Sequence, residues 1–401
     1  MKRHAAVALA IALSAVLAQG LAAQDAEAVV LAYRRNFARA SLATKLELVR
    51  EAAATKGAAM GPLYDMALRF AYENGTLLAG DQQLKELALL AAAEAGEAGY
   101  AKSVDNLWSL FQAYKEPEVR AAALRALGLA GSGESRVAEN LGAFLASQNS
   151  LFRSGAQPEY PALEACVEAL GQLGDGSSFP VLFSAYVAGY APELAAKAAL
   201  ALGKIKGDYE GYLLQVIARN PPIEKAAAFS AGMANPAFGE GERGRLAEAA
   251  MAAALEAYDE PEARSPVELQ ALRELRLRSA RQFKALAWQR ASPLAIRHFR
   301  LVQADYAKGA AAKSELLEAV ACLGAMGSTE AAQTLALHLQ LINAQTEQGS
   351  PYDESLVLAV IEALGELGDK AAFDYLLQMG YLQYNDTIKR AARDALVKLR
   401  W

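Results

Sequence analysis

Ala363-Leu364-Gly365-Glu366-Leu367-Gly368-Asp369 is the stretch that decides the fold, because the same phrase returns elsewhere in the chain. Residues 169–175 read Ala-Leu-Gly-Gln-Leu-Gly-Asp, and residues 201–208 lengthen the phrase by one residue to Ala-Leu-Gly-Lys-Ile-Lys-Gly-Asp. Looser copies occupy residues 126–131 and 322–328. A phrase that recurs in this way indicates an internal repeat.

The phrase has a direct physical interpretation. Leu364 and Leu367 are three residues apart, so they share one face of a helix. Gly365 falls in the last helical turn, where a missing side chain lets another backbone come close, and Gly368 falls where the helix ends in a left-handed residue. Asp369 then suits the N-cap of the next helix. Each repeat is therefore predicted to be a helix, a tight turn and a second helix.

The spacing between the glycines that end successive first helices gives the length of the repeat. These glycines are placed at Gly57, Gly96, Gly131, Gly174, Gly207, Gly327 and Gly368, with steps of 39, 35, 43, 33, 120 and 41 residues. The long step has room for about three units of the ~40-residue period that two-helix repeats show. Such units bury their apolar faces only against their neighbours. The predicted fold class is all-α, an α-solenoid of stacked antiparallel helix pairs.

With this repeated helix-turn-helix phrase, the chain resembles the HEAT-repeat (armadillo-like) family, including the short repeats typified by bilin-lyase-like proteins. The resemblance covers most of residues 40–400 and is strongest at 119–145, 162–218 and 313–401. It implies a solenoid that binds other macromolecules, with second helices lining a concave surface. The family carries no common catalytic residue that could be transferred to this sequence.

The N-terminus has the pattern of a signal peptide. A basic start, Met1-Lys2-Arg3-His4, precedes an apolar run at residues 5–18 that is short for a bilayer span. The small residues around Ala22 and Ala23 suit cleavage. We expect residues 1–23 to be removed and the mature protein to be periplasmic or secreted; an uncleaved anchor is the alternative. No later apolar run is long enough to be a membrane span.

The rest of the chain divides into three expected parts. Residues 24–218 read as N-terminal HEAT-like repeats, residues 219–312 as atypical repeats, and residues 313–401 as C-terminal repeats with a cap. The middle part is set apart by helix-breaking prolines at Asn220-Pro221-Pro222 and Ser265-Pro266.

Composition and motifs point away from catalysis and from nucleic acid. The 45 acidic and 40 basic residues give a net charge of −5, which disfavours nucleic acid as the main partner. Cys166 and Cys322 have no histidine within ten residues, so both are expected to be small buried apolar residues. His298 and His338 fit no metal-ligand spacing. We predict no catalytic residue, no cofactor and no metal.

A glycine-rich stretch follows Asn235-Pro236. Residues 239–244 read Gly-Glu-Gly-Glu-Arg-Gly, but no strand precedes them, as a phosphate-binding loop would require. They are predicted to form a flexible loop between helices.

A basic cluster is conspicuous in this acidic chain. A long helix is predicted at residues 267–291, with apolar Leu272, Leu275, Phe283 and Leu286 on one arc and four basic residues on the adjoining arc. The candidate partner-binding cations are Arg273, Arg276, Arg281 and Lys284, extended by Arg297 and Arg300. They could dock an acidic protein surface or an anionic head group. The preferred interpretation is a solvated face that neutralises neighbouring acidic repeats, because charge runs usually have that role.

Aromatic residues mark the second-helix segments. Tyrosine gives a large contact area at low entropic cost, so Tyr186 and Tyr190 are candidate partner-binding residues. The alternative is packing between repeats, which is the preferred interpretation for Trp108 and Phe111.

Three function classes remain open. The predicted function is a non-enzymatic exported scaffold that binds a macromolecular partner, a protein above all, through the concave face of the solenoid. One alternative is an α/α-toroid enzyme acting on polysaccharide, which would need paired carboxylates that do not stand out here. The other is a docking module for an anionic surface through the basic cluster at 273–300.

Overall fold

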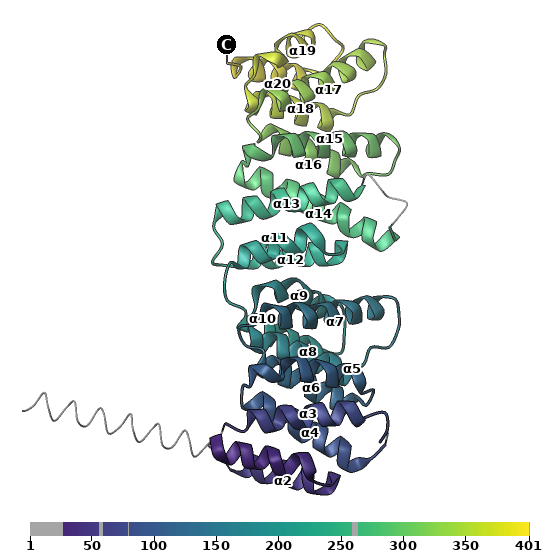
Figure 1. Ribbon diagram of the computed structural model, residues 1–401. Coiled ribbons are helices and arrows are strands. Elements are labelled where there is room, and N and C mark those ends of the chain that lie inside the picture. The colour runs from purple at the N-terminus through teal and green to yellow at the C-terminus, as the bar shows by residue number, and fades with distance from the viewer. Residues whose placement is uncertain (1–26, 56–58, 79, 259–263, 401) are drawn as a thin grey trace, which may run out of the picture. The chain divides into compact units, whose positions relative to one another are not determined.

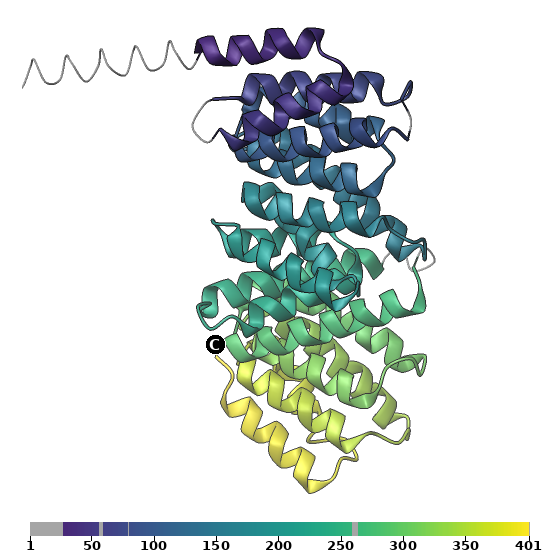
Figure 2. The ribbon, with the colours of Figure 1, turned by 90° about the horizontal axis from the view of Figure 1, so that it is seen from below.

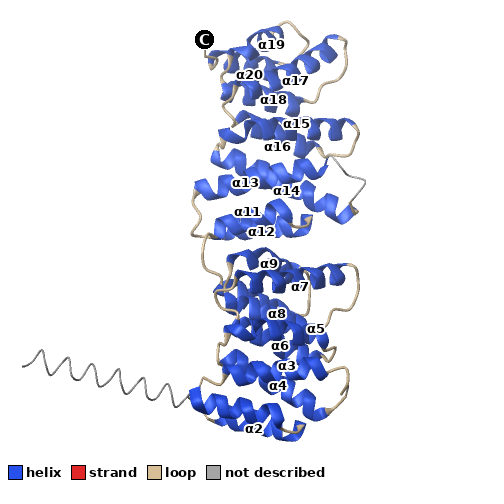
Figure 3. Cartoon of the chain, in the orientation of Figure 1, coloured by secondary structure: helices blue, strands red, loops and turns tan. Residues whose placement is uncertain are grey.

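A computed structural model describes residues 27–55, 59–78, 80–258 and 264–400. The regular elements in these ranges are all helices (Figure 3), beside one isolated bridge between Asp369 and Arg400. The predicted signal peptide, residues 1–23, and the predicted terminator Gly57 lie outside the described residues. The contacts divide the chain into two compact units, Met1–Gly207 and Asp208–Trp401, called unit 1 and unit 2 below. The predicted division at 24–218, 219–312 and 313–401 stays a prediction.

Unit 1 is a stack of helix pairs that begins, in the described part, with a helix at residues 27–39. The helices that follow are α2 (Leu42–Ala54), α3 (Gly61–Asn74), α4 (Gln82–Glu97), α5 (Val104–Ala113), α6 (Pro117–Ala130), α7 (Ser135–Arg153), α8 (Tyr160–Leu173), α9 (Phe179–Val187) and α10 (Pro192–Lys204) (Figure 1). Even-numbered helices pack on one another, as α4, α6 and α8 do, and α6, α8 and α10 contain the Ala-Leu-Gly phrase. They form the first-helix layer, and the odd-numbered helices form the second-helix layer.

Unit 2 has the same two layers. Its helices are α11 (Tyr209–Arg219), α12 (Pro222–Ala234), α13 (Glu240–Tyr258), α14 (Pro266–Leu286), α15 (Ser292–Ala307), α16 (Lys313–Gly324), α17 (Thr329–Glu347), α18 (Glu354–Leu367), α19 (Phe373–Gln378) and α20 (Asp386–Val397). Contacts run along each layer, from α14 to α16, α18 and α20, and from α13 to α15, α17 and α19. Figure 2 shows the same stacking from below. The predicted all-α solenoid of helix pairs is confirmed.

Close contacts between a glycine and an alanine join neighbouring first helices. A Cβ atom added to Gly171 of α8 would lie 2.8 Å from the Cα atom of Ala201 on α10, closer than real side chains come. The corresponding distances elsewhere are 2.9 Å for Gly96 to Ala126, 2.6 Å for Gly128 to Ala169, 3.0 Å for Gly324 to Ala363 and 3.5 Å for Gly365 to Ala395. The phrases at 126–128, 169–171 and 363–365 thus each meet one neighbour through the alanine and the other through the glycine, whereas nothing lies within 4 Å of a Cβ atom added to Gly203. The close approach predicted at the glycine of the phrase is therefore the contact that joins the first helices of neighbouring repeats.

The predicted turn chemistry also holds at the strongest copies. Gly174 and Gly368 end their helices in the left-handed conformation, with φ of 64° and 65°. The side chain of Asp369 then accepts a hydrogen bond from the backbone of Ala371 at 2.8 Å. Gly96 is a correction, because it lies inside α4 against Ala126 and does not end the helix.

The long step between Gly207 and Gly327 holds three helix pairs, α11/α12, α13/α14 and α15/α16, as predicted. The C-cap of α14 is Ala287, whose φ of 45° is positive, at the position that Gly174 and Gly368 occupy after α8 and α18. Two expectations were wrong in detail. The long helix ends at Leu286 instead of continuing to residue 291, and Gly241–Gly244 belong to α13 instead of a flexible loop. Gly244 is needed there, because the ring of Trp288 covers it.

The ends of the two units are built on one plan. Helix α7 at 135–153 and helix α17 at 329–347 are displaced by 194 residues, and so are α8 at 160–173 and α18 at 354–367. The terminators Gly174 and Gly368 keep the same displacement. Every position in α7 and α8 therefore has a structural equivalent in α17 and α18. None of the described helices combines the length and apolarity that crossing a bilayer requires.

Candidate protein-docking surfaces

Two arginines of the predicted basic cluster are paired with carboxylates of the next repeat. Arg273 of α14 forms a two-pronged ion pair with Glu315 of α16, with N–O distances of 2.6 and 3.2 Å. Arg281 pairs in the same way with Glu318 at 2.9 and 3.2 Å. These arginines therefore join two first helices, which agrees with the neutralising interpretation of the cluster.

Arg276 is a correction, because only 1% of its surface is exposed. Its guanidinium lies 4.9 Å from the ring centre of Tyr258 and 3.9 Å from a carboxylate oxygen of Asp305. Tyr258 comes from α13 and Asp305 from α15, so neighbouring helices cover the helical-wheel face at Arg276. Arg276 cannot contact a docked partner.

The remaining cations do not form one surface. Lys284 is exposed near the end of α14, in the first-helix layer, whereas Arg297 and Arg300 are exposed on α15, in the second-helix layer. A terminal nitrogen of Arg297 also lies 3.4 Å from the carbonyl of Leu255, to which it donates. The structure thus separates the six predicted cations among ion pairs, the core and two layers.

His298 is buried beside Arg276, and this gives a pH-dependent prediction. Burial, and then the charge of Arg276, lowers the pKa of His298 to about 3. The unfolded chain has the ordinary value of about 6.5, so the unfolded state takes up this proton first as pH falls. The stability tied to neutral His298 is fully present above pH ~6.5 and is lost between pH ~6.5 and ~3. We expect unit 2 to lose about 3 kcal/mol between pH 7 and pH 4.5 from this group alone.

Urea unfolding of unit 2 at the two pH values, followed by hydrogen exchange of its own peptides, measures this loss. A His298→Leu variant has no group to titrate at that position, so its stability should fall much less over the same range. Equal losses in both proteins would refute the assignment.

The two candidate tyrosines differ in solvent exposure. Tyr186 on α9 is 46% exposed, with its ring 6.3 Å from that of Phe183, so it remains a candidate contact residue. Tyr190 is a correction: it is 6% exposed, its ring stacks on Phe152 at 4.0 Å, and its hydroxyl donates to the Asn149 side chain at 3.0 Å. Tyr190 therefore holds repeats together.

The contact between Tyr190 and Asn149 recurs in unit 2. There the hydroxyl of Tyr384 donates to Asn343 at 3.0 Å, again 41 residues away. Each asparagine also donates its amide to a backbone carbonyl 32 residues ahead, Val181 at 3.1 Å and Tyr375 at 3.0 Å. These buried asparagines were missed by sequence reasoning, although the repeated Asn-to-Tyr spacing is visible in the sequence.

Ion pairs join helices in both layers, as Arg136–Asp105 and Arg245–Glu210 do in the second-helix layer, but parts of the second-helix layer carry no charge. First helices are joined by ion pairs: Arg50–Glu86, Lys85–Glu118, Arg125–Glu168 and Lys197–Glu164 in unit 1, and Arg273–Glu315, Arg281–Glu318 and Lys313–Asp353 in unit 2. In the second-helix layer, residues 140–152 and 176–192 of unit 1 contain no Asp, Glu, Lys or Arg. Residues 331–346 and 375–385 of unit 2 contain none either.

Exposed apolar side chains lie within these charge-free stretches. In unit 1 they are Leu151 on α7, 45% exposed, and Tyr186 on α9. In unit 2, Leu337 and Leu341 on α17 are 55% and 58% exposed, and Tyr381 after α19 is 84% exposed. Depletion of charge with exposed aromatic and aliphatic side chains is the composition of a protein interface core.

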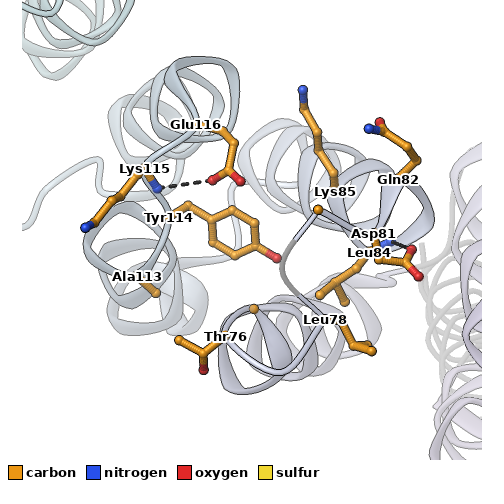
Figure 4. A pocket seen from close by; sticks show the side chains of 12 residues that line it. Thr76, Leu78, Asp81, Gln82, Leu84, Lys85, Ala113, Tyr114, Lys115 and Glu116 are labelled. Atoms are coloured by element: carbon orange, nitrogen blue, oxygen red, sulfur yellow. Dashed lines mark hydrogen bonds between the residues drawn. The ribbon is translucent and has the colours of Figure 1, made fainter.

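A cavity of about 340 Å³ opens among α3, α4 and α5 (Figure 4). Its polar groups are largely occupied within the protein: the Tyr114 hydroxyl donates to the carbonyl of Ala71, Asp81 caps α4, and Lys85 pairs with Glu118. Such engaged groups fix the repeats and leave little to orient a ligand.

Among the described residues, no cluster of side chains suits metal binding or thiol chemistry. No three His, Cys, Asp or Glu side chains of these residues gather closely enough to hold a metal ion. Cys166 and Cys322 are free and buried, as predicted, and burial raises the pKa of both thiols.

No protein-family model matches the chain, and no curated protein matches it. Among solved structures it is similar to a circular tandem repeat protein described as having novel repeat topology and enhanced subunit contact surfaces. The identity is 16%, the match covers 94% of this chain and 82% of that one, and the TM-score is 0.21. A second similarity, to a structure from the computational design of self-assembling cyclic protein homo-oligomers, has 13% identity, coverage of 87% and 94%, and a TM-score of 0.12. The chain is an all-α solenoid of tandem helix pairs, on the evidence of its own helices and their packing.

Proposed function

We propose that this protein is a HEAT-like scaffold, exported and non-enzymatic, that binds a partner protein through its second-helix layer. The observation that carries the proposal is the contrast between the layers. The first helices form ion pairs with neighbouring repeats, whereas residues 140–152 of α7 and residues 176–192, which include α9, contain no charged side chain and expose Leu151 and Tyr186. Apolar side chains that do not pack internally are available to a partner.

The partner chemistry follows from this surface. A neutral face has little to offer a polyanion or an anionic membrane, which need free cations. The ion pairs of Arg273 and Arg281 and the burial of Arg276 weaken the anionic-surface alternative further. A protein segment with exposed apolar side chains fits the surface of α7 and α9 best. Its contact with Tyr186 would use the ring and the hydroxyl together.

The test compares two exposed faces of unit 1. Tagged mature protein is used to isolate the partner from the native envelope fraction by mild cross-linking, and its affinity is then measured with purified components. We expect the Leu151→Ser, Tyr186→Ala double variant to bind at least ~10-fold more weakly, because two exposed anchors are lost. The control is Gln172→Ala on α8, which is exposed in the first-helix layer and should bind normally.

Unchanged melting temperatures keep the comparison valid, since both altered side chains are exposed. If the double variant binds normally, or the α8 variant loses affinity equally, the second-helix layer of unit 1 is not the docking surface. Retention of polysaccharide or lipid in place of protein would favour the alternative functions.

A further inference from the structure

Helix α17 carries an exposed seam with the spacing of a coiled coil. Leu337, Leu341, Ala344 and Gln348 follow at steps of four, three and four residues, and all are exposed. Steps that alternate between three and four residues place side chains along one stripe of a helix, and that stripe packs best against a second helix. The flanking exposed residues are Gln333, Gln340 and Gln345, which are uncharged.

The two leucines are not required by the fold. The equivalent helix of unit 1, α7, has the same length and the same buried asparagine contacts, yet it carries Ala143 and Ser147 where α17 carries Leu337 and Leu341. An exposed leucine gains nothing from folding unless something covers it. The substitution between equivalent positions therefore points to an interaction outside the chain.

Charge indicates what covers the seam. The protein has a net charge of −5, so two copies repel each other in general. Residues 331–346 contain no charged side chain, so two copies can approach there without bringing like charges together. Antiparallel pairing with Leu337 opposite Ala344 offsets Glu330 of one copy from Glu347 of the other by about one helical turn, whereas parallel pairing would set Glu330 and Glu347 each directly beside its own counterpart.

We propose that α17 pairs with α17 of a second copy of this chain, antiparallel, across a two-fold axis. The centre of the seam lies between Leu337 and Ala344, so Leu337 of one copy packs on Ala344 of the other. Leu341 then lies next to its own counterpart. On each side of the axis a large residue, Leu337, packs against a small one, Ala344. This arrangement is self-complementary, as a two-fold interface requires.

The neighbouring helix extends the surface. Leu377 of α19 is 42% exposed and Tyr381, in the loop that follows, is 84% exposed. Helix α19 packs beside α17 in the second-helix layer. An interface built on one helix per copy is small, and we expect a dimer that dissociates at concentrations of about 1–100 µM. The proposal goes beyond partner binding, which uses α7 and α9 of unit 1.

Disulfide trapping tests the pairing. Both native cysteines are buried, so Leu341→Cys introduces an exposed thiol close to the two-fold axis. The matched control is Ser147→Cys, the equivalent position on α7. Under mild oxidation the α17 variant should form a disulfide-linked dimer at least ~10-fold faster than the α7 variant, because proximity raises effective concentration.

Sedimentation velocity across the micromolar range gives the second readout. The wild-type chain should move from monomer to dimer, and a Leu337→Ala, Leu341→Ser variant, which gives α17 the residues of α7, should stay monomeric at the same melting temperature. Equal trapping of the two cysteine variants would overturn the proposal. So would a wild-type chain that stays monomeric, or dimers that persist in the double variant.

Discussion

Replacing Gly171 by leucine is expected to destabilise unit 1 by about 3 kcal/mol or more and to lower its melting temperature by on the order of 10 °C. A Cβ atom at this position would lie 2.7 and 2.8 Å from the Cβ and Cα atoms of Ala201. The backbone of α10 must move to make room, and its packing on α8 is lost. Hydrogen exchange of peptides from unit 1, with thermal unfolding by circular dichroism, measures the effect.

Gly142 of α7 provides the control. It is also a glycine inside a helix, but an added Cβ atom would find only the Val181 side chain, at 3.9 Å, an ordinary contact. Gly142→Ala should therefore stabilise the protein by up to ~1 kcal/mol, the intrinsic helix preference of alanine over glycine. Changes of opposite sign in the free energy of unfolding at Gly171 and Gly142 would support the contact between α8 and α10. Equal, small changes would show that these first helices are not in contact at Gly171. Gly365→Leu should have a smaller effect than Gly171→Leu, because its contact with Ala395 is looser.

Replacing Asn343 by leucine is expected to destabilise unit 2 by about 3 kcal/mol. The asparagine is fully buried and serves two groups at once, the Tyr384 hydroxyl and the Tyr375 carbonyl. A side chain of similar size without hydrogen-bonding groups leaves both with one partner fewer in the core. Urea unfolding, monitored for unit 2 by hydrogen exchange, gives the free energy.

A double-mutant cycle separates the hydrogen bond from the packing. Tyr384→Phe removes the hydroxyl, so the second change, Asn343→Leu, should cost less in that background than in the wild type. If the two single effects simply add, Asn343 and Tyr384 do not act as a pair. The equivalent pair in unit 1, Asn149 and Tyr190, should behave in the same way.

Much of the fold could be predicted because the repeated phrase marks both the contacts between helices and the ends of helices. The Ala-Leu-Gly phrase marks the place where helices touch without side chains, and Gly174 and Gly368 mark where helices end. The atypical middle was harder, because Ala287 takes a left-handed conformation without being glycine. The wheel for α14 also failed at Arg276, since a wheel shows one helix and cannot show that neighbouring helices cover both of its sides.

The candidate site was less predictable for a related reason. A charge in the sequence does not reveal its partner, and Arg273 and Arg281 meet glutamates that lie about one repeat later in the chain. Tyr186 and Tyr190 are four residues apart, yet one is exposed and the other is buried against Asn149. Exposure depends on the next repeat, which a local pattern does not contain. The candidate surface is defined instead by the absence of charge over residues 140–152, 176–192, 331–346 and 375–385.

The separation of roles between the layers is the central claim, and photo-cross-linking tests it most directly. A photoreactive amino acid is placed at Tyr186 or Ser147 in the second-helix layer of unit 1, and at Gln172 or Glu118 in the first-helix layer. After irradiation in the native envelope fraction, adducts are identified by mass spectrometry. The account predicts that one protein partner is captured from the second-helix positions and not from the first-helix positions. Capture of the partner from Gln172 or Glu118, with none from Tyr186 or Ser147, would contradict it.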